Sequence, residues 1–149
     1  MILMLVSKNY MSDIEHIAYK KAFESNQIDK FISSQRWNGI RDSLTLIYYE
    51  KLKSNANQQP KHSKAKIKYV LKKLNGQVIY YTKNDEPFVF DIYDEGVIGG
   101  IRFLASKLSK GESLRAIVPS DLAYGAFGNH VISGYTPVII EMELLEYVL

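Results

Sequence analysis

The side chains that could support covalent or metal chemistry are few in this sequence. There is no cysteine, which excludes a disulfide framework, a thiolate metal site and a cysteine nucleophile. The three histidines, His16, His62 and His130, fall in an expected helix and two expected loops, without the HExxH spacing of a metal-binding helix. We therefore expect no metal site, and the sequence implies no cofactor.

Two acidic residues and a group of glycines also favour structural roles. Glu141 and Glu143 share one face of an expected strand, where exposed charges are more common than a catalytic carboxylate pair. Gly96, Gly99 and Gly100 do not have the spacing of a GxGxxG or P-loop motif. No phosphate-binding loop is predicted.

One tyrosine is placed for binding rather than for packing. Tyr124 is followed by Gly125 in a long loop that opens at Pro119. A tyrosine in such a loop has little core to pack against, whereas loops on a rigid scaffold often carry binding groups. This placement favours a functional role for Tyr124.

A row of lysines alternates with apolar residues from residue 64 to residue 72. This period of two is typical of a strand with one buried face and one solvated face. The row could attract phosphate, but a solvated face is its more common use, and the net charge of +3 is small. We expect no nucleic-acid partner; the alternative would show affinity that falls steeply with salt. The lysines are Lys64, Lys66, Lys68 and Lys72, and the apolar face has Ala65, Ile67, Tyr69 and Leu71.

The first 41 residues predict a helical extension. Ser12 and Glu15 have the spacing of a capping box, and apolar residues follow at helical intervals up to Ser25. A second short helix is expected over residues 27–35, before Trp37 and the following Asn-Gly break the pattern. Both apolar stripes are narrow, so these helices need a surface, either the sheet of the same chain or a second copy.

After Gly39 the apolar period changes to two, which predicts five or six strands and one internal helix. Asn75-Gly76 marks a tight hairpin turn. We expect an α+β domain over residues 42–149, following an extension over residues 1–41. The expected strands cover residues 42–53, 64–72, 78–82, 88–92, 113–118 and 138–146, with a loop at 54–63 and the helix at 101–108.

The composition indicates one ordinary domain with an extension. Of 149 residues, 46% are hydrophobic and 23% are charged, the balance of a globular chain. The apolar run over residues 2–6 is too short for the core of a signal peptide, and no stretch approaches ~18 consecutive apolar residues. We expect no membrane span and no targeting signal in this chain.

Residues 42–149 resemble the FKBP-type peptidyl-prolyl isomerases. The resemblance begins at Asp42, is strongest from Ala65 onward, and rests on several motifs that occur in the family's order. It implies an FKBP-like twisted antiparallel β-sheet wrapped around one short helix, with the ligand bound between them. The motifs are KYVLKKLNG, the PFVF segment, VIGGIRFLASKLSKGESLRAIVP, SDLAYGAFG with its AYG loop, and TPVIIEMELL.

Within that family, the helical leader and the segment QVIYYT most resemble the FKBP-like lipoproteins associated with gliding bacteria. This likeness implies a location in the periplasm or cell envelope, and a lipid anchor on a cysteine that this chain lacks. It also leaves open a homodimer formed through the N-terminal helices.

The family resemblance implies cis-trans isomerisation of X-Pro bonds in proline-containing polypeptides, assisting protein folding. Rotation about a peptide bond must cross a barrier of ~18–20 kcal/mol, because amide resonance is lost. An apolar pocket that holds the prolyl ring favours this less polar, twisted amide over the planar form. No nucleophile, metal or redox group is needed.

The resemblance also assigns the site residues. The Tyr124 hydroxyl and the Ile98 backbone N–H would be the catalytic groups, each donating to a substrate carbonyl. Phe90, by contrast, is expected in the core. The substrate-binding residues would be Tyr69, Ile79, Tyr80, Phe88, Val97, Ile101, Ile132 and Ile140.

Several of these residues depart from the family pattern. Ile101 and Ile140 stand where the family usually has Trp and Phe, and Ile79-Tyr80 replaces Phe-Asp. An aromatic side chain buries ~150–250 Å², so their loss predicts a wider, less aromatic pocket. Weak isomerase activity and weak macrolide binding are expected, and a catalytically silent FKBP-like chaperone or interaction module is the alternative.

Overall fold

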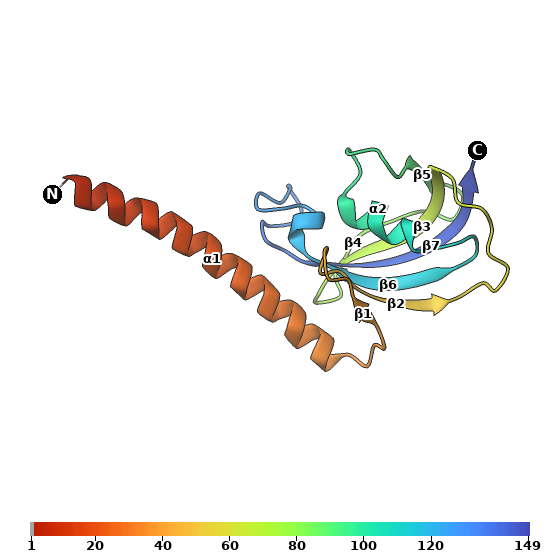
Figure 1. Cartoon of the computed structure of the whole chain (residues 1–149), viewed down its shortest axis with the longest axis horizontal. Coiled ribbons are helices and arrows are strands. Elements are labelled where there is room, and N and C mark those ends of the chain that lie inside the picture. Colours follow the sequence, from red (N-terminus) through yellow and green to blue (C-terminus); the bar gives the residue numbers. More distant parts are fainter. Residues whose placement is uncertain (1) are drawn as a thin grey trace.

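A long N-terminal helix leads into a twisted sheet that wraps around a short helix (Figure 1). The computed structural model describes residues 2–149, and side chains over residues 12–149. Neither helix in these residues is long and apolar enough to cross a bilayer. The elements are α1 Ile2–Ser34, β1 Ile40–Arg41, β2 Tyr48–Lys53, β3 Lys64–Lys73, β4 Val78–Tyr81, β5 Phe88–Asp91, α2 Gly99–Ser106, β6 Ser113–Val118, the 3₁₀ helix η1 Ser120–Leu122 and β7 Val138–Val148.

The seven strands form one antiparallel sheet in the order β1-β2-β6-β7-β3-β4. β3 pairs with β7 along its whole length, while β5 and β4 pair with the first and second parts of the other edge of β3. The expectation of five or six strands is therefore too low. The extra strand is the two-residue β1, which pairs with β2 and lies just before the domain boundary expected at residue 42. That boundary stays a prediction.

The strand expected over residues 42–53 is wrong in its first part, because Asp42 forms a turn. Its carboxylate accepts hydrogen bonds from the N–H groups of Leu44 and Thr45, at 3.2 and 2.7 Å, and from the Thr45 hydroxyl at 2.8 Å. The Thr45 donors lower the pKa of Asp42. Leu44 is 92% exposed and Leu46 has a φ of 60°. Local bonding to Asp42 thus outweighs the strand-like alternation of apolar residues.

The two helices expected over residues 12–25 and 27–35 are also wrong, because they form one helix. α1 runs for 33 residues without interruption, so Ser12 and Glu15 lie inside it rather than at an N-cap. Neither glycine nor proline occurs before Gly39, and the polar residues between the two apolar stripes disfavour helix only weakly. Only the C-terminal part of α1 lies against the domain (Figure 1).

The core lies between the inner face of the sheet and α2. The alternation predicted for β3 is confirmed, since Ala65, Ile67 and Leu71 are buried while Lys64 is exposed. Phe90 is also buried in this core, as expected. Burial of such side chains is the main stabilising term of the domain. The core includes Ile47, Leu104, Leu108, Leu114, Ala116, Val118, Val138, Met142 and Leu144.

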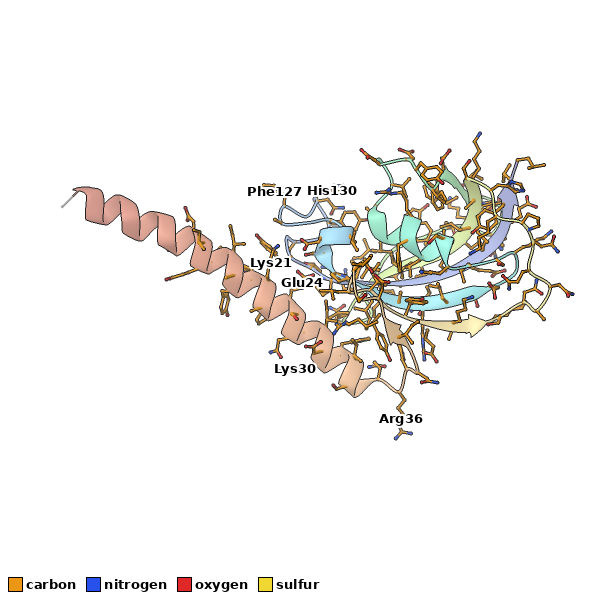
Figure 2. All side chains as sticks on the ribbon, viewed as in Figure 1. Lys21, Glu24, Lys30, Arg36, Phe127 and His130 are labelled. Carbon is orange, nitrogen blue, oxygen red and sulfur yellow. The ribbon has the colours of Figure 1, made fainter. Side chains whose placement is uncertain are left out.

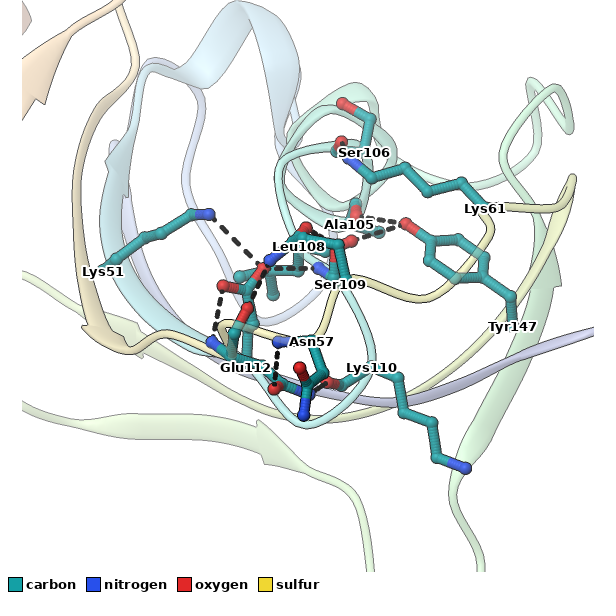
Figure 3. Close-up of polar contacts among 12 residues, drawn as sticks. Lys51, Asn57, Lys61, Ala105, Ser106, Leu108, Ser109, Lys110, Glu112 and Tyr147 are labelled. Atoms are coloured by element: carbon teal, nitrogen blue, oxygen red, sulfur yellow. Dashed lines mark hydrogen bonds and ion pairs between the residues drawn. The ribbon is translucent and has the colours of Figure 1, made fainter.

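A buried carboxylate holds the turn between α2 and β6 (Figure 3). Glu112 is 1% exposed, and accepts hydrogen bonds from the N–H groups of Ser109 and Asn55, at 2.7 and 3.0 Å, and from the Lys51 ammonium at 3.3 Å. Burial raises the pKa of Glu112, but these donors outweigh it and hold that pKa below its ordinary value. The loop over residues 54–63 is thereby fastened to the body of the domain.

The same turn is held from its other side by β7. The Tyr147 hydroxyl lies 2.9 Å from the Ala105 carbonyl and 2.7 Å from the Leu108 carbonyl, so it shares its one proton between the last turn of α2 and the turn that follows (Figure 3). The Ala105 carbonyl also accepts from the Leu108 N–H at 3.1 Å, and Leu108 lies two residues beyond the end of α2. β7 therefore closes the end of α2.

Candidate active site

The loop that carries Tyr124 is fixed by hydrogen bonds on both sides of that residue. The N–H groups of Ala123 and Gly125 both donate to the Ser120 carbonyl, at 2.9 and 2.8 Å. Gly125 has a φ of 69°, which glycine adopts at little cost. The backbone at Tyr124 is thus anchored to η1.

The Tyr124 hydroxyl is available to a ligand. Its ring is half-buried against the core, and its hydroxyl forms no hydrogen bond with another described group. Among the described residues, no side-chain oxygen sealed from solvent lacks a partner, so this hydroxyl reaches the surface. Burial raises the pKa of Tyr124, which keeps the hydroxyl protonated and able to donate.

A second free donor lies at the start of α2. Ile98 is the N-cap residue, and its carbonyl accepts from the N–H groups of Ile101 and Arg102, at 3.1 and 3.3 Å. Its own N–H has no acceptor in the described part of the chain. A partly buried N–H without a partner is uncommon in folded proteins. This N–H is therefore suited to bind a carbonyl oxygen.

Two glycines allow the start of α2 to pack closely against η1. A Cβ at Gly100 would lie 2.6 Å from Val118 Cγ1 and 3.1 Å from the Leu122 carbonyl oxygen, and one at Gly99 would lie 3.0 Å from Leu122 Cδ2. The first turn of α2 consequently packs directly against η1. Because η1 precedes Tyr124, this contact brings the Tyr124 loop to the Ile98 end of α2.

Aromatic rings form one wall of the site. The Tyr69 ring centroid lies 5.2 Å from that of Tyr80 and 6.0 Å from that of Phe88. Burial raises the pKa of Tyr69, and the nearby hydroxyls of Tyr80 and Tyr124 raise it further. The structure thus brings these four predicted residues together.

Tyr80 reaches this wall because of a bulge in β4. Tyr80 pairs with Leu71 and Tyr81 with Val70, but the next pair is Val78 with Lys72. Directly paired residues in an antiparallel sheet point to the same face. Tyr80 therefore shares the inner face with Leu71, although it is still 47% exposed. A regular strand would not place both Val78 and Tyr81 on the outer face.

The aliphatic residues expected in the pocket lie in or against the core beside the aromatic wall. Ile101, Ile132 and Ile140 are 4%, 0% and 0% exposed and belong to the core, while Ile79 and Val97 pack against them from partly exposed positions. The larger described cavity, of about 540 Å³, lies on the other face of the sheet. Leu52, Val70, Val78 and Tyr81 line it, with Lys68, Glu141 and Glu143 beside them.

The match of the chain to known proteins is consistent with this arrangement. Residues 56–145 match the family model described as FKBP-type peptidyl-prolyl cis-trans isomerase. The chain belongs to this family. Its FKBP domain has the fold that the resemblance implied, an antiparallel sheet around α2 preceded by the N-terminal helix, although the sheet has seven strands. No group of three or more metal-binding side chains occurs in the described part of this FKBP chain.

Solved structures share this FKBP fold. A peptidyl-prolyl cis-trans isomerase from Pseudomonas syringae pv. tomato superposes with a TM-score of 0.71 at 22% identity, covering 89% of this chain and 96% of that one. FkpA from Escherichia coli gives a TM-score of 0.71 at 24% identity, covering 87% of this chain and 59% of that one.

A curated relative is much longer than this chain. FK506-binding protein 4 of Emericella nidulans is 27% identical over 127 residues, which are 85% of this chain and 26% of that protein. The FKBP chain described here thus spans about a quarter of the length of that relative.

Sequence reasoning missed two residues beside the site. Glu24 of α1 accepts hydrogen bonds from Ser120, 96 positions away, and Ser120 in turn anchors the Tyr124 loop. No local pattern in either segment of the FKBP chain indicates this contact. Glu24 interrupts the apolar stripe of α1, which was the one available signal.

Proposed function

We propose that this protein is a peptidyl-prolyl cis-trans isomerase of the FKBP type, acts on X-Pro bonds of polypeptides and has low activity. One observation carries the proposal: two donors without internal partners, the Tyr124 hydroxyl and the Ile98 N–H, belong to residues that pack against the same apolar core. Family membership supports the same reaction. Its clients are proline-containing segments of folding proteins.

The proposed mechanism uses the apolar wall and the two donors separately. The prolyl ring packs against Tyr69 and Phe88, beside Ile101. In this setting the twisted amide, which has lost resonance, is favoured over the more polar planar form. Tyr124 and Ile98 hold the carbonyls on either side of the rotating bond, so that little orientational freedom is lost during the reaction.

Low activity follows from the residues that replace the family's rings. Ile101 and Ile140 are buried aliphatic side chains, which offer a substrate no flat, rigid surface. Tyr80 lies beside Tyr69 where the family usually has an aspartate, so no carboxylate is present there. We expect macrolides to bind weakly for the same reason.

A protease-free assay with a prolyl peptide tests this proposal. The wild-type chain should accelerate isomerisation above the uncatalysed rate, and Tyr124→Phe should lower kcat/KM about fivefold, since a neutral hydrogen bond contributes ~1 kcal/mol. Tyr93→Phe is the control, because Tyr93 is 77% exposed in a turn. Background rates for both the wild-type chain and Tyr124→Phe would reject catalysis.

The buried isoleucines favour a second candidate function, that of a silent chaperone module. Such a module would bind unfolded chains through the same apolar wall without accelerating isomerisation. Suppression of aggregation of an unfolded client by the wild-type chain, at a background isomerisation rate, would support it. Replacing Phe88 with alanine should then weaken suppression, whereas Tyr124→Phe should leave it unchanged.

We further propose that α1 pairs with α1 of a second copy. The part of this helix that precedes Lys21 extends away from the domain (Figure 1), and Ile14, Ile17 and Phe23 are 45%, 46% and 51% exposed. A helix with an unpacked apolar stripe is only marginally stable in water. Sedimentation should give a dimer for the wild-type chain and a monomer for Ile17→Glu; a wild-type monomer would reject the pairing.

A periplasmic or cell-envelope location is also proposed. It is supported by the likeness of the helical leader and the QVIYYT segment to the gliding-motility-associated FKBP-like lipoproteins of bacteria. Fractionation of the native cells with an antibody against this chain tests the location. Recovery in the cytoplasmic fraction alone would contradict it.

A further inference from the structure

α1 is joined to the domain through a buried carboxylate. Glu24 is 6% exposed, and its two oxygens accept hydrogen bonds from the Ser120 N–H and the Ser120 hydroxyl, both at 2.6 Å. Figure 2 shows Glu24 on the side of α1 that faces the domain, whereas Lys30 and Arg36 point away. One side chain of the helix thus holds both donors of one residue of η1.

This contact is not a simple ion pair. Glu24 forms no salt bridge within the described residues, because the nearby Lys21 lies 3.8 Å from Asp121 instead. A buried carboxylate is costly unless hydrogen bonds replace its lost hydration, and charge-assisted bonds are strong and directional. The geometry therefore fixes the position of Ser120 closely, which apolar packing alone would not require.

A cavity lies beside the hydrogen bonds between Glu24 and Ser120. It has a volume of about 200 Å³ and lies between α1 and the domain, with Glu24, Ile28, Leu46 and Pro119 in its lining. Ile28 is buried beside the cavity, and farther along α1 Phe31 packs against Trp37 with ring centroids 5.7 Å apart. Between α1 and η1 the 2.6 Å Glu24 hydrogen bonds are much shorter than the 3.8 Å contact from Lys21 to Asp121, so they set the distance between the two helices.

Ser120 connects Glu24 to the loop that contains Tyr124. Its N–H and hydroxyl bind Glu24, while its carbonyl accepts from the N–H groups of Ala123 and Gly125, the two neighbours of Tyr124. All the polar groups of Ser120 are therefore in use. A single residue separates the leader helix from the loop that presents the Tyr124 hydroxyl.

We propose that Glu24 is a positioning residue for the isomerase site. By holding Ser120, it fixes the Tyr124 hydroxyl relative to the Ile98 N–H and makes the efficiency of the reaction depend on α1 being docked. The inference rests on the proposed function, because it assumes that Tyr124 contacts the substrate.

The test uses the full chain and a control that loosens the same helix elsewhere. Glu24→Ala should lower kcat about threefold with little change in KM, because the hydroxyl is misplaced in the transition state while the apolar wall is intact. Glu24→Gln keeps an acceptor and should recover most of the rate. The control is Arg41→Ala, which removes the 3.0 Å bond from Arg41 to Asp29 of α1 and should leave kcat unchanged.

A spectroscopic readout separates positioning from general destabilisation. With 3-fluorotyrosine incorporated and the signal of Tyr124 assigned, Glu24→Ala should shift or broaden that signal, and Arg41→Ala should not. Should Glu24→Ala fail to fold, Ser120→Ala removes only the hydroxyl bond and should show a smaller change of the same kind. Both readouts are made on folded protein, verified by a cooperative thermal transition.

The outcomes distinguish this inference from the proposed function. Activity that survives Tyr124→Phe unchanged overturns the assignment of the site itself. A loss in Tyr124→Phe, together with unchanged kcat and an unchanged fluorine signal in Glu24→Ala, overturns the positioning role alone. Equal losses of kcat in Glu24→Ala and Arg41→Ala also overturn it, since docking of α1 in general would then explain the effect.

Discussion

Glu112 and Glu24 are both buried carboxylates, but their surroundings differ. Glu112 gathers donors from three residues, Ser109, Asn55 and Lys51, and so joins separate segments inside the domain. Glu24 binds only Ser120 and joins the domain to a helix that is otherwise largely exposed. The comparison indicates that the first carboxylate stabilises the fold, whereas the second sets the position of one loop.

The largest expected effect is on global stability. Glu112→Ala should lower the free energy of unfolding by ~3 kcal/mol, because the N–H groups of Ser109 and Asn55 lose their acceptor. Glu24→Ala should cost less than half as much in the same urea titration, since α1 contributes little to the core. Equal losses for the two variants would remove the distinction between the carboxylates.

A fall in pH should reduce the stabilisation that Glu112 provides. The pKa of Glu112 is held below its ordinary value of 4.5, so its stabilisation is complete above that pH and is lost as pH falls through the folded pKa. The free energy of unfolding should therefore decrease between pH 6 and pH 3. Glu112→Gln should flatten this decrease, measured by urea unfolding across the range, and an unchanged slope would contradict the assignment.

A smaller loss of stability is expected for Tyr147, which contacts the turn between α2 and β6 from the side opposite Glu112. Tyr147→Phe should lower the free energy of unfolding by ~1 kcal/mol, because the Ala105 and Leu108 carbonyls lose the hydroxyl that they share. Burial and the charge of Glu112 also raise the pKa of Tyr147, so the stabilisation is present below pH 10 and lost as pH rises through the folded pKa. Tyr93→Phe, at an exposed position, should change neither the free energy of unfolding nor its dependence on pH.

The smallest effect is expected for the lysine row of β3. Lys66 and Lys72 form surface ion pairs with Glu146 and Glu141, each at 2.9 Å. Exposed pairs of this kind contribute ~0.2–1 kcal/mol and are screened by salt, so Lys66→Ala should lower the free energy of unfolding by less than 1 kcal/mol. A larger loss that persists in high salt would show that the row has more than a solvated role.

The body of the fold could be predicted where one local rule acts alone. Alternation located β3 and β6, and Asn75-Gly76 located the hairpin, because side-chain period and turn chemistry are properties of short segments. At Asp42 two rules compete, and hydrogen bonding to Thr45 prevails over alternation. The continuity of α1 was missed because weak helix formers near Ser25 are tolerated when no glycine or proline follows.

The site was predicted less completely, because its arrangement depends on distant contacts. Tyr69, Phe88 and Tyr124 could be named from motifs, and the structure brings them together. The bulge that turns Tyr80 inward, and the bond between Glu24 and Ser120, arise from pairing and docking that no short segment specifies. Their roles in the reaction stay predictions.

The close contact at Gly100 leaves no room for a larger residue at this position. A methyl group there would lie 2.6 Å from Val118 Cγ1 of β6 and 3.1 Å from the Leu122 carbonyl oxygen of η1, so the first turn of α2 would have to move away from both. The gap between the two proposed donors would widen, although neither donor had been altered. A position outside the proposed site would thereby set the spacing of the groups proposed to hold the substrate.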